Sequence, residues 1–130
     1  MNNRVYIIGT GKVGTAFSFE LSDAGYNVNF LTGRNLADNN NIAGKIHPLE
    51  YSAKLEKRFI EVAEIILICV QDKYLKDLTR DISDLNMDLS GKCFIHTSGS
   101  ESTDVFNYNC FDKDKCVSMH PIQTFDKISH

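Results

Sequence analysis

The stretch that decides the fold of this chain reads Gly9-Thr10-Gly11-Lys12-Val13-Gly14. It follows a short apolar run at residues 5–8, which is typical of a buried strand. After it, apolar side chains recur at helical spacing until Gly25, where the pattern ends. The sequence therefore predicts a strand, a tight glycine turn and a helix in immediate succession.

This succession is the context in which a glycine pattern indicates a dinucleotide-binding turn. Gly9 permits the tight turn, Gly11 lets the backbone approach a pyrophosphate, and Gly14 lets the helix pack closely on the strand. The first amides of the helix and the positive end of its dipole then face the phosphates. We predict that the whole turn binds the cofactor, namely Gly9, Thr10, Gly11, Lys12, Val13 and Gly14. A glycine triplet without these flanks would indicate an ordinary turn, and Lys12 has a solvated surface position as its alternative.

Composition indicates one soluble domain. The chain has 130 residues, of which 42% are hydrophobic and 24% charged, with a net charge of −3. This charge points to neither a nucleic-acid surface nor a membrane surface, and no apolar run is long enough to cross a bilayer. No secretory leader is recognisable, so we predict a cytoplasmic protein with reduced thiols. The four cysteines lack metal-site spacing, although Cys110 and Cys116 would be able to pair if oxidised.

Further strands are predicted at residues 27–31, 65–70, 92–96 and 116–119, with helical patterns between them. A weak helix is expected at residues 36–42 and another piece around 55–63. Ser98 and Glu101 have the spacing of a capping box and predict a helix start. Alternating strands and helices indicate a single α/β domain over residues 1–130 with a doubly wound parallel sheet of six strands. Such sheets bind ligands beyond the carboxyl ends of their strands.

The end of the second strand bears on which cofactor would bind. NAD sites usually place an acidic residue there, but this segment reads Thr32-Gly33-Arg34 and has no carboxylate. Arg34 would pair with a 2′-phosphate and Thr32 would add a hydroxyl donor, so the pattern favours NADP over NAD. The alternative is that Arg34 is a solvated loop residue. At the end of the next buried strand, Val70, Gln71 and Asp72 are predicted to meet the cofactor mainly through their main chain.

Two histidines follow predicted strands directly. If those strands are neighbours, His96, Ser98 and His120 would converge near the nicotinamide. Histidine exchanges protons near neutral pH, which suits a dehydrogenase, and we name these three residues as catalytic candidates. The alternatives are that each histidine bonds only to main chain and that Ser98 caps a helix. Two histidines without a third ligand are weak evidence for zinc, so no metal site is predicted.

The motifs together resemble the Rossmann-like NADP oxidoreductases of the 6-phosphogluconate dehydrogenase-like superfamily, in the branch with a helical C-terminal domain of unknown function. The matching segments are residues 8–14, 67–72, 96–99 and 118–125, which span nearly the whole chain. The group also resembles prephenate dehydrogenases and pyrroline-5-carboxylate reductases. In prephenate dehydrogenases a similar histidine–proline pair borders the substrate, which by analogy places His120 there.

The resemblance implies dehydrogenase or reductase chemistry on a small molecule that it does not name. The family pattern usually has proline where this chain has Gln71, which leaves the local backbone there open. Relatives continue into an all-helical domain that completes the active site and forms a dimer. We therefore expect residues 1–130 to be either the cofactor domain alone or a shortened relative, inactive by itself, in which an uncovered sheet edge or apolar face would favour self-association. The alternatives are a cofactor-binding sensor without catalysis and an interaction domain that binds no nucleotide.

Overall fold

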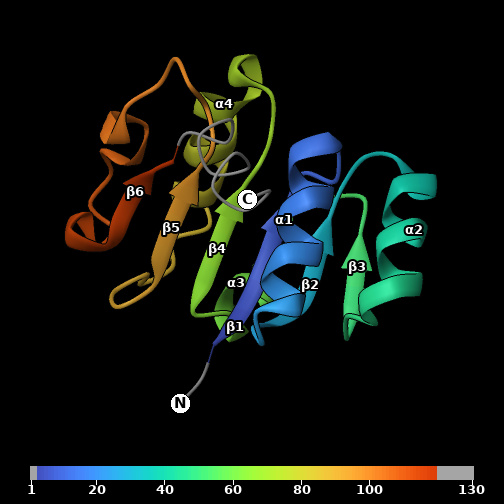
Figure 1. The fold of residues 1–130 in the computed structure, drawn as a ribbon. Helices are drawn as coiled ribbons and strands as arrows, with labels where there is room; N and C mark the ends of the chain where they lie inside the picture. Colours follow the sequence, from blue (N-terminus) through green and yellow to red (C-terminus); the bar gives the residue numbers. More distant parts are fainter. Residues whose placement is uncertain (1–2, 120–130) are drawn as a thin grey trace.

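One parallel sheet organises the computed structural model, which describes residues 3–119 (Figure 1). Its six strands lie in the order β3-β2-β1-β4-β5-β6, and every neighbouring pair is parallel. The chain moves outward from β1 to β3, returns to the other side of β1, and moves outward again to β6. The predicted doubly wound α/β sheet is confirmed. The strands are β1 Arg4–Ile8, β2 Asn27–Thr32, β3 Glu50–Ser52, β4 Ile65–Ile68, β5 Cys93–His96 and β6 Cys116–Ser118.

Helices cover both faces of the sheet. On the near face in Figure 1 lie α1 (Lys12–Asp23) and α2 (Leu36–Ile46). On the far face lie α3 (Lys57–Val62) and α4 (Asp72–Ser83). Two 3₁₀ turns, η1 at Thr103–Phe106 and η2 at Lys113–Lys115, connect β5 to β6. The sheet is thus the middle of three layers.

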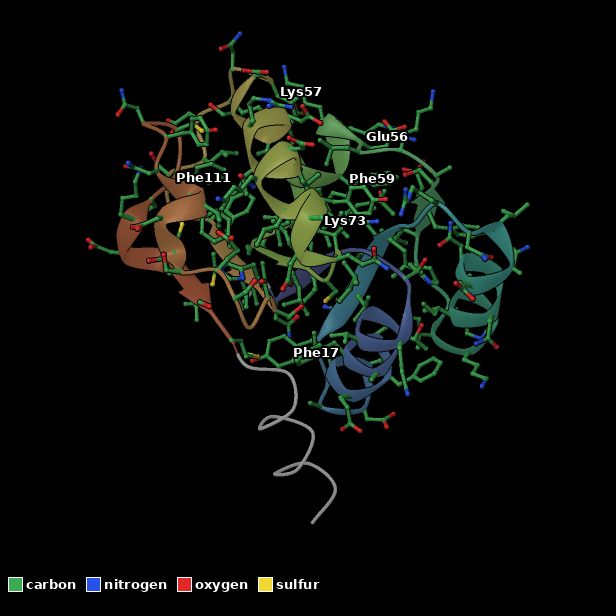
Figure 2. The ribbon with its side chains drawn as sticks, turned by 90° about the horizontal axis from the view of Figure 1, so that it is seen from above. Phe17, Glu56, Lys57, Phe59, Lys73 and Phe111 are labelled. Atoms are coloured by element: carbon green, nitrogen blue, oxygen red, sulfur yellow. The ribbon has the colours of Figure 1, made fainter. Side chains whose placement is uncertain are left out.

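The central strands are apolar throughout because both of their faces are buried. Val5 and Ile7 of β1 belong to the core on the α1 side, together with Phe17. Tyr6 belongs to the opposite core, where its ring contacts the stacked pair Phe30 and Phe59. Figure 2 shows Phe17 and Phe59 on opposite sides of the sheet. This double burial fixes β1, and with it the start of the glycine turn, in the middle of the molecule.

The structure differs from the sequence-based prediction in three segments. The second helix extends to Ile46, beyond the predicted residues 36–42. Its C-cap is His47, which has a φ of 54° in the left-handed region. Strand β3 was not predicted from the sequence. It is only three residues long and lies at an edge of the sheet, so it leaves no clear pattern. The helix predicted to start at Ser98 is absent, and a 3₁₀ turn capped by Ser102 follows instead. The Ser98 N–H donates to Nδ1 of His96, and such local bonds compete with helix formation.

The outer part of the sheet is less covered than its centre. On the α1 side of β5 and β6, Ile95 is half-buried and Val117 is 40% exposed. No helix of residues 3–119 lies over these two strands on that side (Figure 1). Within the same residues, every helix is too short or too polar to span a membrane.

The start of α1 is pressed against the glycine turn. A Cβ at Gly14 would lie 1.7 Å from the carbonyl oxygen of Gly9, far inside contact distance. Gly9 itself has a φ of 103°, and a Cβ there would lie 2.6 Å from the carbonyl oxygen of Cys69. The fold therefore needs glycine at both positions, because backbone atoms occupy the space of any side chain.

We expect Gly14→Ala to lower the free energy of unfolding by about 2 kcal/mol or more, because the helix must shift away from the turn. Gly44→Ala in α2 is the matched control, since a Cβ at Gly44 meets nothing within 4 Å. That control should stabilise the chain by up to about 1 kcal/mol through helix propensity. Urea denaturation measures both. Wild-type stability in Gly14→Ala would contradict the close packing.

Candidate functional site

A groove of about 520 Å³ opens beyond the carboxyl ends of β1, β2 and β4, where the strand order reverses. This is the place where open α/β sheets bind ligands. Eight of the predicted cofactor residues line it: Gly9, Thr10, Gly11, Thr32, Gly33, Arg34, Val70 and Gln71. Lys12, Val13, Gly14 and Asp72 are outside its lining, the first three because they already belong to the opening turn of α1. The residues predicted from the sequence thus form part of the groove wall, and the other lining residues were not predicted.

The glycine turn is held between its two neighbouring strands. The Gly9 N–H donates to the Thr32 carbonyl at 2.7 Å, and the Cys69 N–H donates to the Ile8 carbonyl at the same distance. Gly11, in contrast to Gly9 and Gly14, has nothing within 4 Å of the position a Cβ would take. The turn is therefore rigid at its ends and open toward the groove at its middle.

The N-terminus of α1 has no internal compensation for its free amides. Gly11 is the N-cap and supplies no side-chain bond, and the first turn has no acidic residue. The other two long helices differ, since Asn35 caps α2 through the Asp38 N–H and Asp72 lies in the first turn of α4. Unpaired amides and an uncompensated dipole favour an anion. The site is chemically suited to a phosphate group.

A buried asparagine locks the glycine turn to the next turn of the groove. The hydroxyl of Thr10 donates to Oδ1 of Asn39 at 2.6 Å, and Nδ2 of Asn39 donates to the Gly33 carbonyl at 2.8 Å. A Cβ at Gly33 would lie 1.8 Å from the Thr10 hydroxyl oxygen, so glycine is needed there too. Sequence reasoning missed Asn39, which is 1% exposed, because a run of three asparagines indicated a loop or the end of a weak helix.

The hydroxyl of Thr32 is already engaged inside the protein. It lies 2.5 Å from the Tyr6 hydroxyl and 2.8 Å from Oγ of Ser52. Burial raises the pKa of Tyr6 to about 12, so its phenol stays protonated in this network. Thr32 lines the groove. A hydrogen bond from its hydroxyl to a cofactor, as expected from the sequence, would compete with the bonds to Tyr6 and Ser52.

Two cationic side chains line the groove. Arg34 follows β2 directly, and its guanidinium carbon lies 4.6 Å from the centre of the Tyr74 ring. Lys54, which follows β3, also lines the groove and was missed by sequence reasoning because β3 was not recognised. Three carboxylates reach the same lining, from Asp38, Asp77 and Asp81. The two cations are the groups of the lining that would attract a phosphomonoester.

The main chain turns into α4 at Gln71, where the sequence left the local backbone open. Gln71 is the N-cap in an extended conformation, so the residue that replaces the usual proline is accommodated. Asp72 turns toward the β5 loop, where its Oδ2 accepts a hydrogen bond from the Ser100 hydroxyl at 2.7 Å. Hydrogen bonds from Ser100 and Ser98 hold the pKa of Asp72 below its ordinary value. Asp72 thus ties the start of α4 to the loop after β5.

His96 is fully buried and bonded to main chain through both ring nitrogens. Its Nε2 lies 2.8 Å from the Ser102 carbonyl oxygen, and its Nδ1 accepts from the Ser98 N–H at 3.1 Å. These partners require the neutral ring with its proton on Nε2. The ring also packs on Phe106. His96 therefore holds the loop after β5 through main-chain bonds. This arrangement agrees with the alternative that the histidine bonds only to main chain.

Strands β5 and β6, which precede the loops of the catalytic candidates, are neighbours. His96 of β5 pairs with Ser118 of β6. His120 lies outside the described residues, and Ser98 is buried at the base of the β5 loop, apart from the groove lining. Across residues 3–119, no three His, Cys, Asp or Glu side chains gather in a way that would hold a metal ion.

The sequence of the chain matches the Rossmann-like domain family over residues 2–121. The chain belongs to this family. The match covers the sheet, the glycine turn and the groove described above. None of the curated proteins compared with the chain matches it.

Solved structures share the fold of this Rossmann-like domain. One is a Bacteroides fragilis protein assigned as an NADP oxidoreductase, which is 22% identical over 83% of the chain, with a TM-score of 0.65. Prephenate dehydrogenase from A. aeolicus, solved with hydroxyphenyl propionate and NAD⁺, is 13% identical over 94% of the chain, with a TM-score of 0.72. Pyrroline-5-carboxylate reductase from Coxiella burnetii is 16% identical over 81%, with a TM-score of 0.65. The chain spans 40%, 42% and 38% of these proteins, so the likeness concerns one part of each.

We expect His96→Leu to lower the free energy of unfolding by about 2–4 kcal/mol, because it leaves the Ser98 N–H and the Ser102 carbonyl without partners. His96→Gln, whose amide is able to replace one of these bonds, should lose about half as much. Urea denaturation at neutral pH distinguishes the three proteins. If His96→Leu kept wild-type stability, the main-chain role would be excluded and the catalytic hypothesis strengthened.

Proposed function

We propose that this Rossmann-like domain binds NADP and serves as the cofactor-binding part of an oxidoreductase that acts on a small molecule. The observation that carries the proposal is the contrast among the three glycines of the turn. Gly9 and Gly14 are required by the fold, whereas a side chain at Gly11 would meet only open space. A ligand lying on the start of α1 would fill that space. Folding does not require glycine at position 11, whereas close approach of a ligand would.

The preference for NADP over NAD rests on charge at the far end of the groove. The turn after β2 reads Gly33-Arg34-Asn35 and presents a guanidinium where NAD-binding proteins usually present a carboxylate. Lys54 adds a second positive charge to the same lining. Asp38 lies in the first turn of α2, and its charge, with those of Asp77 and Asp81 in the same lining, would oppose these cations in part. Two fold neighbours, one assigned to NADP and one solved with NAD⁺, are compatible with either cofactor.

The residues present fit such a cofactor in separable roles. The amides at the start of α1 would hold the diphosphate, and Arg34 with Lys54 would hold a 2′-phosphate. When bound, the nicotinamide supplies or accepts a hydride. His96 positions the β5 loop and its Ser98, and His120 remains our candidate for proton transfer through the resemblance to prephenate dehydrogenases.

The wider assignment is also a proposal. We place the domain in the 6-phosphogluconate dehydrogenase-like superfamily, in a cytoplasmic protein whose helical C-terminal domain completes the active site and forms a homodimer. The coverage of the solved structures supports a larger enzyme, since the chain spans 38–42% of the three described above. The outer faces of Ile95 and Val117 are a surface that such a further part would cover.

A second candidate is a cofactor-binding module without catalysis. The observation that favours it is the engagement of both His96 nitrogens by main chain, which removes one of the two histidines expected to transfer protons. The two functions differ in turnover. An oxidoreductase, supplied with its remaining domain, would oxidise NADPH with some carbonyl or imine substrate, whereas a sensor would bind NADPH and oxidise none.

We expect Gly11→Asp to fold as stably as wild type, because the Cβ has open space and aspartate is a good N-cap. The same change should abolish dinucleotide binding, since a carboxylate would occupy the place of the diphosphate. At 100 times its dissociation constant NADPH should stabilise the wild-type chain by about 2.7 kcal/mol, seen as a thermal shift.

Gly44→Ala, which replaces an equally unhindered glycine far from the groove, should keep the full thermal shift. If Gly11→Asp bound NADPH with wild-type affinity, the dinucleotide would have to bind away from the start of α1, and the proposal would be contradicted. A wild-type chain with no shift for NADPH, NADH or FAD would favour an interaction domain.

We expect Arg34→Ala to raise the dissociation constant for NADPH about tenfold and that for NADH less than twofold, because a charge-assisted contact to the 2′-phosphate is lost. Isothermal titration gives both constants. Lys57→Ala removes one positive charge from α3, outside the groove lining, and should change neither (Figure 2). Equal affinity of the wild type for the two cofactors would refute the role of the arginine.

A further inference from the structure

Arg34 does not lie free above the groove. Its guanidinium carbon is 4.6 Å from the centre of the Tyr74 ring, within the range of a cation–π contact. Arg34 follows β2, whereas Tyr74 lies in the first turn of α4, which follows β4. Because β2 and β4 are the two neighbours of β1, the contact joins elements on either side of the strand that leads into the glycine turn.

Both ends of this contact are anchored. On the arginine side, the Gly33 N–H donates to the Ser52 carbonyl at 3.0 Å and its carbonyl accepts from Asn39 at 2.8 Å. On the tyrosine side, the next residue, Leu75, is 1% exposed and holds α4 on the sheet. The backbones that carry the two side chains are therefore fixed, although the guanidinium itself is exposed.

We infer that Tyr74 is a positioning residue for cofactor specificity, which holds the Arg34 guanidinium ready for the 2′-phosphate of an adenosine dinucleotide. This inference rests on the proposed function and adds to it the residue that makes the arginine selective. A guanidinium carries five N–H donors, and the ring and hydroxyl of one tyrosine engage only part of them, so donors remain for a phosphate. Holding the side chain in advance also reduces the rotamer freedom lost on binding.

A second cation supports the same geometry. Nζ of Lys73 lies 5.0 Å from the Tyr74 ring centre, and Lys73 precedes Tyr74 in the first turn of α4 (Figure 2). A hydrogen bond from Arg34 and the charge of Lys73 lower the pKa of Tyr74. Two positive groups thus lie close to the same ring, and the electron-rich face of an aromatic ring attracts cations.

The test compares NADPH and NADH by isothermal titration on the 130-residue chain. Tyr74→Leu should raise the dissociation constant for NADPH about fivefold and leave that for NADH within twofold, because only the 2′-phosphate contact depends on the ring. Tyr74→Phe keeps the ring and should retain NADPH selectivity to within twofold of wild type. Tyr26→Leu, which replaces an exposed tyrosine away from the groove, should change neither constant.

Adenosine 2′,5′-bisphosphate and AMP give a second readout that does not involve the nicotinamide. Tyr74→Leu should weaken the bisphosphate and spare AMP. If Tyr74→Leu weakened NADPH and NADH equally, the ring would be a general adenosine contact and the inference would fail. An unchanged NADPH-to-NADH ratio in Tyr74→Leu would overturn it too, while the proposed function would survive in both cases. Wild-type protein that bound neither dinucleotide would remove the proposed function itself.

Discussion

The close contact between the start of α1 and the glycine turn is the constraint on which the rest of this structure depends. With no Cβ at Gly14, the first turn of the helix rests on the carbonyl oxygen of Gly9, and Gly9 in turn rests on the main chain at Cys69. Any side chain at either position would push α1 away from β1. The start of α1, where we propose that a diphosphate binds, would then move relative to the groove at the reversal of strand order. The packing of α1 and the proposed binding geometry therefore depend on the same backbone contact.

Much of the fold is readable from the sequence because its strongest signals come from buried strands. The apolar runs of β1 and β4 are long enough to be recognised, and their burial on both faces identifies a parallel sheet. The edge strand β3 gives no such signal, since two of its three residues, Glu50 and Tyr51, are exposed. The capping-box spacing at Ser98 predicted a helix that does not form, because the buried ring of His96 competes for the same backbone amide.

Residues of the candidate site were predictable from the sequence where local backbone structure positions them. They were not predictable where tertiary packing positions them. Local sequence identified the glycine turn and Arg34, since both follow strands directly. Asn39 was not recognisable, because its burial arises only when α2 packs against the turn after β2. The pairing of Arg34 with Tyr74 likewise joins residues forty positions apart in the chain. His96 had two open interpretations from sequence, and its two main-chain partners favour the structural one.

The claim at the centre of this account is that the amides at the start of α1 receive the diphosphate of a dinucleotide. The most direct measurement is a titration of the isotope-labelled chain with NADPH, followed by ¹⁵N–¹H correlation spectra. The account predicts that the largest shifts fall on the amides of Gly11, Lys12, Val13 and Gly14, with smaller ones around Arg34. Shifts that spare these amides while others move, or a spectrum unchanged at saturating NADPH, would contradict it.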